Sequence, residues 1–334
     1  MTSPPSSRLV DLACLAVVTV YGVNFVVMKQ ALQRFDIPTF NVVRFTIMVT
    51  MGWALQIFNH ARRGHALLPA GADVARLCFA GGVGFFGFLY GFTIGLRHTS
   101  AFSSALLTGM SSLFVALLLW ATGAEALGRR LVAALGIAFI GAVVFVVGRT
   151  SGRVELKSGD VIALGAAFLY AAYLVINRPL TSKYPATSLT TWSMTVAYVV
   201  VLAVGGPFVH NQDWSRVNAA AWWSMAWAVT LPVFASWSVW AWANGKVGAA
   251  RPALFLVFVP VVSGIAAWLL LDEEVRMLQV VGVAIVVGAL LTGRGRTGTG
   301  RGQQDLQRTR TTVVPTVSPA SRSTKACGAD SRPS

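Results

Sequence analysis

Long stretches of uncharged, mostly apolar residues are the feature of this sequence that most restricts its fold. The residues from Thr99 to Thr122 include no Asp, Glu, Lys or Arg, and neither do those from Leu131 to Gly148 or from Ala219 to Gly245. A helix needs about 20 such residues to cross a bilayer, because hydrocarbon offers no hydrogen-bond partner to its backbone. A water-soluble domain has no place for so many of these stretches, so the sequence predicts a membrane protein.

The composition favours the same solvent. Hydrophobic residues make up 55% of the chain and charged residues 12%, whereas roughly a quarter of the residues in soluble domains are charged. The formal net charge is +15, but the basic residues lie in the connections and in the C-terminal tail. We therefore interpret the positive charge as a sign of membrane topology, and expect no nucleic-acid partner.

Charged and turn-rich points divide residues 8–293 into ten predicted spans. The first five lie at 8–28, 37–58, 73–95, 99–121 and 127–148, and the second five at 159–179, 187–208, 219–242, 249–271 and 276–293. The connections between them are short and polar. We expect an all-α membrane protein of about ten transmembrane helices.

The topology follows from the Lys and Arg residues. If the N-terminus is cytoplasmic, thirteen of those in or near the predicted spans lie inside and eight lie outside, as the positive-inside rule requires. The chain is then a multi-pass protein of the inner (cell) membrane with both termini in the cytoplasm. Residues 294–334 are rich in Gly, Ser, Thr and Arg and are predicted to form a disordered, basic cytoplasmic tail.

An internal repeat organises the predicted spans. The pairs Asp11 and Asp160, Tyr21 and Tyr170, and Lys29 and Arg178 share an offset of 149, and the pairs Ala101 and Ala249, Trp120 and Trp268, and Glu125 and Glu273 share an offset of 148. Five spans are an odd number, so the second half crosses the membrane in the opposite sense to the first. Inverted halves produce alternating access to one midplane site. We expect two inverted five-helix repeats at 8–148 and 159–293; a duplication with a purely structural role is the alternative.

Several motifs, in this order and over both halves, resemble a known family. They are YGVNFVVMKQAL (21–32), PTFNVVRF (38–45), the segment 95–125 that ends in Glu, GDVIALGAAFLYAAYLVINRPL (159–180) and the segment 245–274. Together they resemble the EamA branch of the drug/metabolite transporter superfamily, of the ten-helix type, across residues 8–293. The resemblance implies a carrier of amino acids, related metabolites or drugs, with EamA-like repeats at 8–148 and 159–293. Ser112 stands in the slot that Pro260 fills in the second half, so the fourth predicted helix lacks a proline kink.

Arg44 is the one basic residue well inside a predicted span. An arginine in hydrocarbon is costly, so it should face a cavity or a partner. It could attract a carboxylate or phosphate of the solute, or it could reach the ends of neighbouring helices. The Asp and Glu residues lie near span ends or in connections, which argues against a proton relay through buried carboxylates.

Aromatic and amphipathic residues near the predicted midplane are further candidates for the solute site, although plain packing is the alternative for each. With Arg44, the candidate substrate-binding residues are Tyr21, Asn24, Arg44, Tyr90, Thr108, Ser111, Tyr170, Tyr173, Phe234, Trp237 and Phe258.

Other motifs have simpler explanations. Residues 82–87 match the dinucleotide pattern G-x-G-x-x-G, but they lie in an apolar span without a preceding soluble strand. Gly87, Gly91 and Gly95 instead predict a flat helix face that another helix can approach closely. The three cysteines lack metal-ligand spacing, so we expect no metal, cofactor or catalytic residue.

The sequence thus predicts a secondary transporter, not an enzyme, that exports amino acids or related small metabolites by alternating access. Its partners would be a small-molecule solute and the lipid bilayer, with a homodimer as an open alternative to a monomer. Efflux of amphipathic drugs by the same fold is the nearest rival. A polytopic enzyme acting on lipid-linked substrates and a membrane scaffold that moves no solute are the rivals from other classes.

Overall fold

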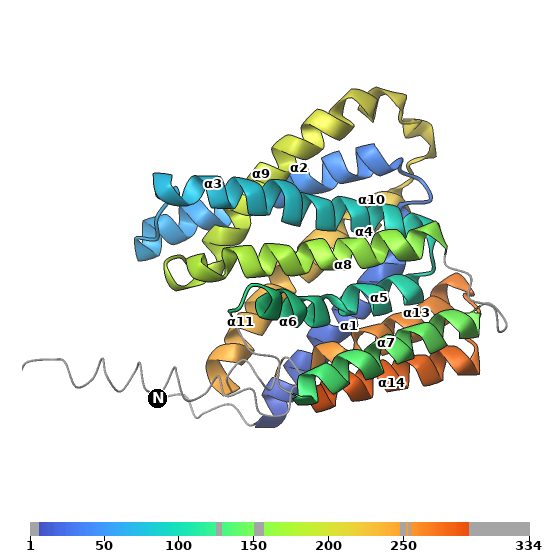
Figure 1. The fold of residues 1–334 in the computed structure, drawn as a ribbon. Helices are drawn as coiled ribbons and strands as arrows, with labels where there is room; N and C mark the ends of the chain where they lie inside the picture. Colours follow the sequence, from blue (N-terminus) through green and yellow to red (C-terminus); the bar gives the residue numbers. More distant parts are fainter. Residues whose placement is uncertain (1–6, 125–128, 150–156, 248–251, 253–254, 294–334) are drawn as a thin grey trace, which may run out of the picture. The chain divides into compact units, whose positions relative to one another are not determined.

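The computed structural model describes residues 7–124, 129–149, 157–247, 252 and 255–293, and their regular structure is helical (Figure 1). The first part of the chain forms α1 (Ser7–Ala31), α2 (Ile37–Arg63), α3 (Gly71–Phe79), η1 (Ala80–Phe85), α4 (Phe86–His98), α5 (Ala101–Gly109), α6 (Ser111–Ala121) and α7 (Arg129–Arg149). The second part forms α8 (Ser158–Asn177), η2 (Arg178–Ser182), α9 (Ala186–Gly205), η3 (Gly206–Asn211), η4 (Trp214–Arg216), α10 (Ala219–Val229), η5 (Thr230–Ala235), α11 (Ser236–Val247), η6 (Leu256–Phe258), α13 (Val259–Leu271) and α14 (Met277–Gly293).

Each of the ten predicted spans contains a helix. Within the described residues, six helices are long and apolar enough to cross a membrane, at 8–31, 37–62, 71–98, 101–121, 158–182 and 186–211. Shorter apolar helices lie at 132–148, 256–271 and 277–289. The all-α class is confirmed, whereas ten crossings remain a prediction, and the predicted disordered tail lies outside the described residues.

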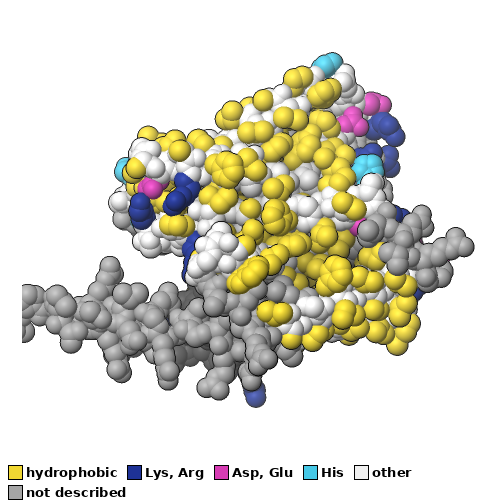
Figure 2. Space-filling model, in the orientation of Figure 1, with side chains coloured by type: hydrophobic (Ala, Val, Ile, Leu, Met, Phe, Trp, Pro, Cys, Tyr) yellow, Lys and Arg dark blue, Asp and Glu magenta, His cyan; other side chains and the backbone are white. Residues whose placement is uncertain are grey.

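The surface of the helices suits a lipid environment. Large apolar side chains such as Phe139 of α7 and Leu269 of α13 are 65% and 61% exposed. On the face drawn in Figure 2, hydrophobic side chains cover the middle of the helices, and charged side chains gather toward their two ends. Exposed apolar surface of this extent would be unfavourable in water and favourable in a bilayer.

Small residues bring helices from the two parts of the chain together. In α4, a Cβ at Gly95 would lie 3.0 Å from the backbone nitrogen of Ala163 in α8, and a Cβ at Gly91 would lie 3.4 Å from the Cβ of Ala166. The flat glycine face predicted for this segment is therefore confirmed, and α8 occupies it. In the same way α7 packs along α14 (Figure 1), with Gly282 of α14 against the backbone of Phe145.

The helices are interrupted at matched places in the two parts of the chain. A π-helical segment lies at Ala80–Phe85 and another at Thr230–Ala235, an offset of 150. The first is rich in glycine, and the second contains Pro232, which has no N–H to continue the α-helical hydrogen bonding.

The fourth predicted helix is also interrupted, although it lacks the proline. It breaks at Met110 between α5 and α6, and the second part breaks between η6 and α13 at Phe258, an offset of 148. The sequence-based expectation had linked bending here to proline alone. The structure shows a break without it, next to Gly109.

Candidate functional site

A row of aromatic side chains runs through the main core and contains several of the predicted site residues. The ring of Tyr170 in α8 lies 4.4 Å from that of Phe88 in α4 and 6.1 Å from that of Tyr173, which in turn lies 5.1 Å from Phe85. The fold thus brings two predicted residues, Tyr170 and Tyr173, together with Phe85 and Phe88.

Other predicted residues lie at the interruptions of the helices. Thr108 and Ser111 flank the break at Met110, Phe258 lies at the break before α13 and is 43% exposed, and Phe234 lies within the π-helical segment η5. The Oγ1 atom of Thr108 is buried and has no hydrogen-bond partner among the described residues. The carbonyl oxygen of Phe234 is not free, because it accepts from Ser238 Oγ at 2.8 Å. At these interruptions the hydroxyl group of Thr108 is therefore the candidate contact for a polar solute.

The remaining predicted residues are more isolated. Tyr90 is half-buried, with its ring 5.2 Å from that of Phe86. Asn24 is buried and donates from Nδ2 to the sulfur of Met28 at 3.5 Å. The side chain of Trp237 lies outside the described residues. In the described part of the chain, no hydrogen bond or ring contact joins Tyr21, Asn24, Tyr90 or Phe258 to Tyr170 and Tyr173.

Arg44 is buried, with 4% of its surface exposed. Its Nε and Nη1 atoms are buried, and neither has a hydrogen-bond acceptor among the described residues. No described Asp or Glu forms an ion pair with it. A buried guanidinium group without a counter-charge is therefore available to bind an anion.

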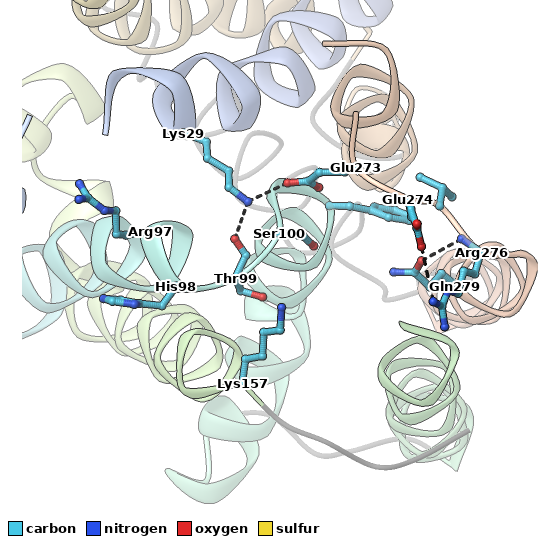
Figure 3. Close-up of a pocket in the computed structure, with 12 residues that line it drawn as sticks. Lys29, Arg97, His98, Thr99, Ser100, Lys157, Glu273, Glu274, Arg276 and Gln279 are labelled. Carbon is cyan, nitrogen blue, oxygen red and sulfur yellow. Dashed lines mark hydrogen bonds and ion pairs between the residues drawn. The ribbon is translucent and has the colours of Figure 1, made fainter. Parts of the chain in front are cut away.

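A second polar group, which the sequence reasoning did not select, closes one end of the helices (Figure 3). Lys29 at the end of α1 donates from Nζ to Glu273 Oε1 at 2.7 Å and to the carbonyl oxygen of Thr99 at 2.7 Å. The same Oε1 atom accepts from the backbone N–H of Ala101 at 3.0 Å. We call Lys29, Thr99, Ala101 and Glu273 the closing cluster. It joins the first part of the chain to the second.

Local backbone structure places Glu273 in this cluster. The helix α13 ends at Leu271 and is followed by Asp272, which has φ 51° and ψ 32°, in the left-handed region. Aspartate accepts this conformation more readily than most residues other than glycine. The turn directs the next residue, Glu273, back over α1 and α5.

Further polar contacts surround the closing cluster. Thr99 donates from its hydroxyl group to Asp160 Oδ1 at 2.5 Å, and the N–H of Lys157 donates to Asp160 Oδ2 at 3.0 Å, which fixes the start of α8. Gln212 accepts from the N–H of Asp36 at 2.7 Å and donates to the carbonyl of Arg34 at 3.2 Å. Several elements from both parts of the chain are therefore held together at this end.

A cavity of about 440 Å³ lies beside the closing cluster. Its charged lining consists of Lys29, Arg97, Lys157, Glu273, Glu274 and Arg276, together with His98 (Figure 3). Water can reach the outer side of the cluster through this cavity. The cluster itself is less accessible, because the side chains of Lys29 and Glu273 are only 22% and 16% exposed.

At the opposite end of the helices, polar contacts between the two parts of the chain gather among α2, α3, η2 and α9. Lys183 forms an ion pair with Asp73 at 3.1 Å, and the Tyr184 hydroxyl group donates to the same carboxylate at 2.9 Å. Trp192 donates from Nε1 to the carbonyl of Leu67 at 3.0 Å. Different helices therefore connect the two parts of the chain at the two ends of the helix bundle.

The closing cluster was missed because its members are far apart in sequence. Lys29 and Glu273 are separated by 244 residues. One signal was available, since the repeat aligns Lys29 with Arg178 and Glu273 with Glu125, so that the halves carry a basic and an acidic residue at equivalent helix ends. Glu125 itself lies outside the described residues.

The helical fold, its apolar surface and a polar site between two similar parts of the chain define a multi-pass membrane transporter. The sequence profile of the EamA-like transporter family matches residues 8–147 and again residues 157–293. The chain therefore belongs to the EamA-like transporter family, and the predicted resemblance is confirmed.

Individual proteins agree with this assignment. The chain is 26% identical over 280 residues to an uncharacterized transporter of Bacillus subtilis, YyaM, covering 82% of this chain and 90% of that one. It is 26% identical over 294 residues to a probable amino-acid metabolite efflux pump of Escherichia coli, covering 85% and 94%. A solved crystal structure has the same fold, with a TM-score of 0.56 at 18% identity, covering 87% of this chain and 99% of the other.

Proposed function

We propose that this chain is a secondary carrier that exports amino acids or related small metabolites by alternating access between two inverted five-helix halves. The observation that carries the proposal is the closing cluster, in which Lys29 from the first half pairs with Glu273 from the second at 2.7 Å. A carrier with two halves needs contacts that close one end of its solute pathway and that can break when the other end closes.

The matched interruptions of the helices support the same cycle. A π-helical segment or a break in a helix is a place where the helix can bend without losing its packing on both sides. The interruptions lie at offsets of 150 and 148 residues, close to those of the sequence repeat. Two halves that bend at equivalent points can exchange conformations, as alternating access requires.

The direction of the closed end follows from the predicted topology. With both termini in the cytoplasm, the ends of α1 and α13 face the outside, so the closing cluster is an outer gate. In the proposed cycle, the conformation described here has its outer gate closed. Opening of the outer gate then releases the solute on the far side of the inner membrane.

The nature of the solute rests on two supports. The relative from Escherichia coli is called a probable amino-acid metabolite efflux pump, and the buried Arg44 could bind a carboxylate. The row formed by Phe88, Tyr170, Tyr173 and Phe85 favours a second candidate, efflux of amphipathic drugs, because aromatic faces bind flat cations well. In both cases the chain moves its solute and does not modify it.

Counterflow in proteoliposomes tests the proposal. Vesicles loaded with one amino acid at high concentration are diluted into the same labelled amino acid, over a panel of amino acids and with a fluorescent cationic dye as the rival solute. Alternating access predicts saturable uptake of label that depends on the unlabelled solute inside, with and without a pH gradient. Exchange of the dye alone would favour drug efflux, and flux that is neither saturable nor stimulated by internal solute would contradict a carrier.

A further inference from the structure

The position of Arg44 on α2 shows which way its guanidinium group is directed. Thr46 and Trp53 of α2 form hydrogen bonds to Tyr198 and Thr195 of α9, at 2.9 Å each. Asn41, on another face of α2, accepts from Thr93 of α4 at 3.1 Å. Arg44 is three residues after Asn41 and so shares its face. It is therefore directed away from α9 and toward the interior of the bundle.

The cation in this interior has no counter-charge in the described part of the protein. The described acidic residues lie at helix ends or in connections. Those with bonds described here are engaged elsewhere: Glu273 with Lys29 and Ala101, and Asp160 with Thr99 and Lys157. Asp73 is bound at the opposite end of the helices. A buried charge in this situation is stable only if an anion or water reaches it.

Uncharged groups in the interior also lack partners. The Oδ1 atom of Asn24, the hydroxyl groups of Ser104 and Thr108 and the Nε1 atom of Trp227 are buried without a hydrogen-bond partner among the described residues. Such atoms in the interior of a transporter are free to bind a polar solute. They are neutral, so none of them would neutralise an ammonium group as a carboxylate would.

We propose that Arg44 binds the carboxylate group of the transported solute, and that the described residues supply no charged partner for an amino group at this site. The substrate class is then small carboxylates with an apolar or aromatic side chain, whether or not they carry the α-amino group. This inference rests on the proposed function, because it describes the solute of the same carrier. It differs from a general amino-acid site, which would require both charged groups.

The chemistry of arginine makes the assignment specific. A guanidinium group can donate two parallel hydrogen bonds to one carboxylate, and this geometry is not reproduced by the ammonium group of lysine. Removing the carboxylate from the solute should therefore weaken binding as much as replacing Arg44. Removing the amino group from the solute should change the binding affinity little.

Matched solutes test the inference by competition in the counterflow assay and by thermal unfolding of purified protein in detergent. L-Leucine carries both groups, 4-methylpentanoate carries only the carboxylate and L-leucinamide carries only the amine; the corresponding phenylalanine set repeats the comparison with an aromatic side chain. In the wild-type protein, we expect the amino acid and the simple carboxylate to bind within a few-fold of each other, and the amide at least tenfold more weakly.

Variants then connect this preference to one residue. In Arg44→Gln, binding of both carboxylates should weaken at least tenfold while binding of the amide is unchanged, and Arg44→Lys should recover only part of the loss. The ligand-free stability of Arg44→Gln should not fall, because the described residues include no hydrogen-bond or ion-pair partner of Arg44. Arg34→Gln, which changes an exposed arginine at the closed end, is the matched control.

Three results would overturn the inference: an amide that binds as well as its carboxylate, a preference for carboxylates that survives in Arg44→Gln, or failure of every carboxylate in both sets to bind. The proposed function fails separately. If carboxylates stabilise the purified protein through Arg44 but no solute is transported, the carboxylate site is supported and the carrier function is refuted. If solutes are transported whether or not they carry a carboxylate, the carrier function is supported and the carboxylate site at Arg44 is refuted.

Discussion

Replacing Lys29 by Met should open the outer gate. The substitution removes an ion pair at 2.7 Å and a hydrogen bond to the Thr99 carbonyl, and it leaves Glu273 beside the Ala101 N–H without its cation. Exposed pairs contribute about 0–1 kcal/mol and breaking fully buried pairs costs about 3–5 kcal/mol. The side chains here are 22% and 16% exposed. We therefore expect the open state to gain about 2 kcal/mol, or roughly 30-fold in population.

Glu273→Gln should have a smaller effect, because its amide oxygen can still accept from the Ala101 N–H. About 1 kcal/mol, or roughly fivefold, is expected for loss of the charge alone. The exchanged pair Lys29→Glu with Glu273→Lys should recover part of the closed population, since it keeps the attraction but loses the two backbone contacts.

A cysteine reporter beneath the gate measures these changes. Ser104 in α5 is fully buried one turn below Ala101. In a background without Cys14, Cys78 and Cys327, Ser104→Cys should react with a membrane-impermeant thiol reagent only when the gate is open. Its rate of modification from the outside then follows the open fraction, provided that closing is faster than reaction.

The matched control is Glu274→Gln. Glu274 pairs with Arg276 at 3.5 Å in the same cavity, but its side chain is 83% exposed, so its loss should leave the rate unchanged. An unchanged rate in Lys29→Met, or an equal increase in Glu274→Gln, would refute the assignment of the closing cluster as the gate.

Three further predictions concern packing and local structure. Gly282→Ala should destabilise the protein by about 1–3 kcal/mol in detergent unfolding, because the new Cβ would lie 2.5 Å from the backbone nitrogen of Phe145. The control Gly288→Ala, whose Cβ would meet nothing within 4 Å, should be neutral or slightly stabilising. Equal effects of the two substitutions would contradict the close contact between α7 and α14. Tyr184→Phe removes a hydrogen bond to Asp73 and the acceptor for the Ala70 N–H, so the same assay should show a loss of about 1–2 kcal/mol, and no loss would argue against both bonds. Asp272→Gly should preserve the gate and Asp272→Val should raise the rate of modification at Ser104→Cys, because φ is 51° at this position; similar rates would show that the turn does not position Glu273.

Much of the fold follows from local sequence. The apolar runs predict a helix in each of the ten expected spans, because the period and length of apolar residues depend only on near neighbours. The glycines at 87, 91 and 95 predict a close helix contact for the same reason, and α8 fills it. The break at Met110 was not predicted. It occurs without a proline, where the packing of α5 on α13 and of α6 on α8 decides the direction of each segment.

The candidate site is harder to predict from the sequence than the fold. Tyr170 and Tyr173 were selected by their depth in the spans, and the fold places their rings 6.1 Å apart. Tyr21, Asn24 and Tyr90 were selected on the same grounds, and no ring contact or hydrogen bond among the described residues joins them to that pair. Depth along a helix can be estimated from sequence, but the direction of a side chain toward a particular neighbour depends on how the helices are packed.

Arg44 and the closing cluster separate what the sequence determines from what the tertiary structure determines. The sequence by itself determined that this chain spans a membrane, where its helices run, and that one arginine lies deep within a span, because hydropathy is a local property of the chain. Only the tertiary structure decided that Lys29 meets Glu273 across 244 residues and that Arg44 meets no described acid at all. Pairing between charges depends on distances of a few ångströms between separate helices, and packing alone sets those distances.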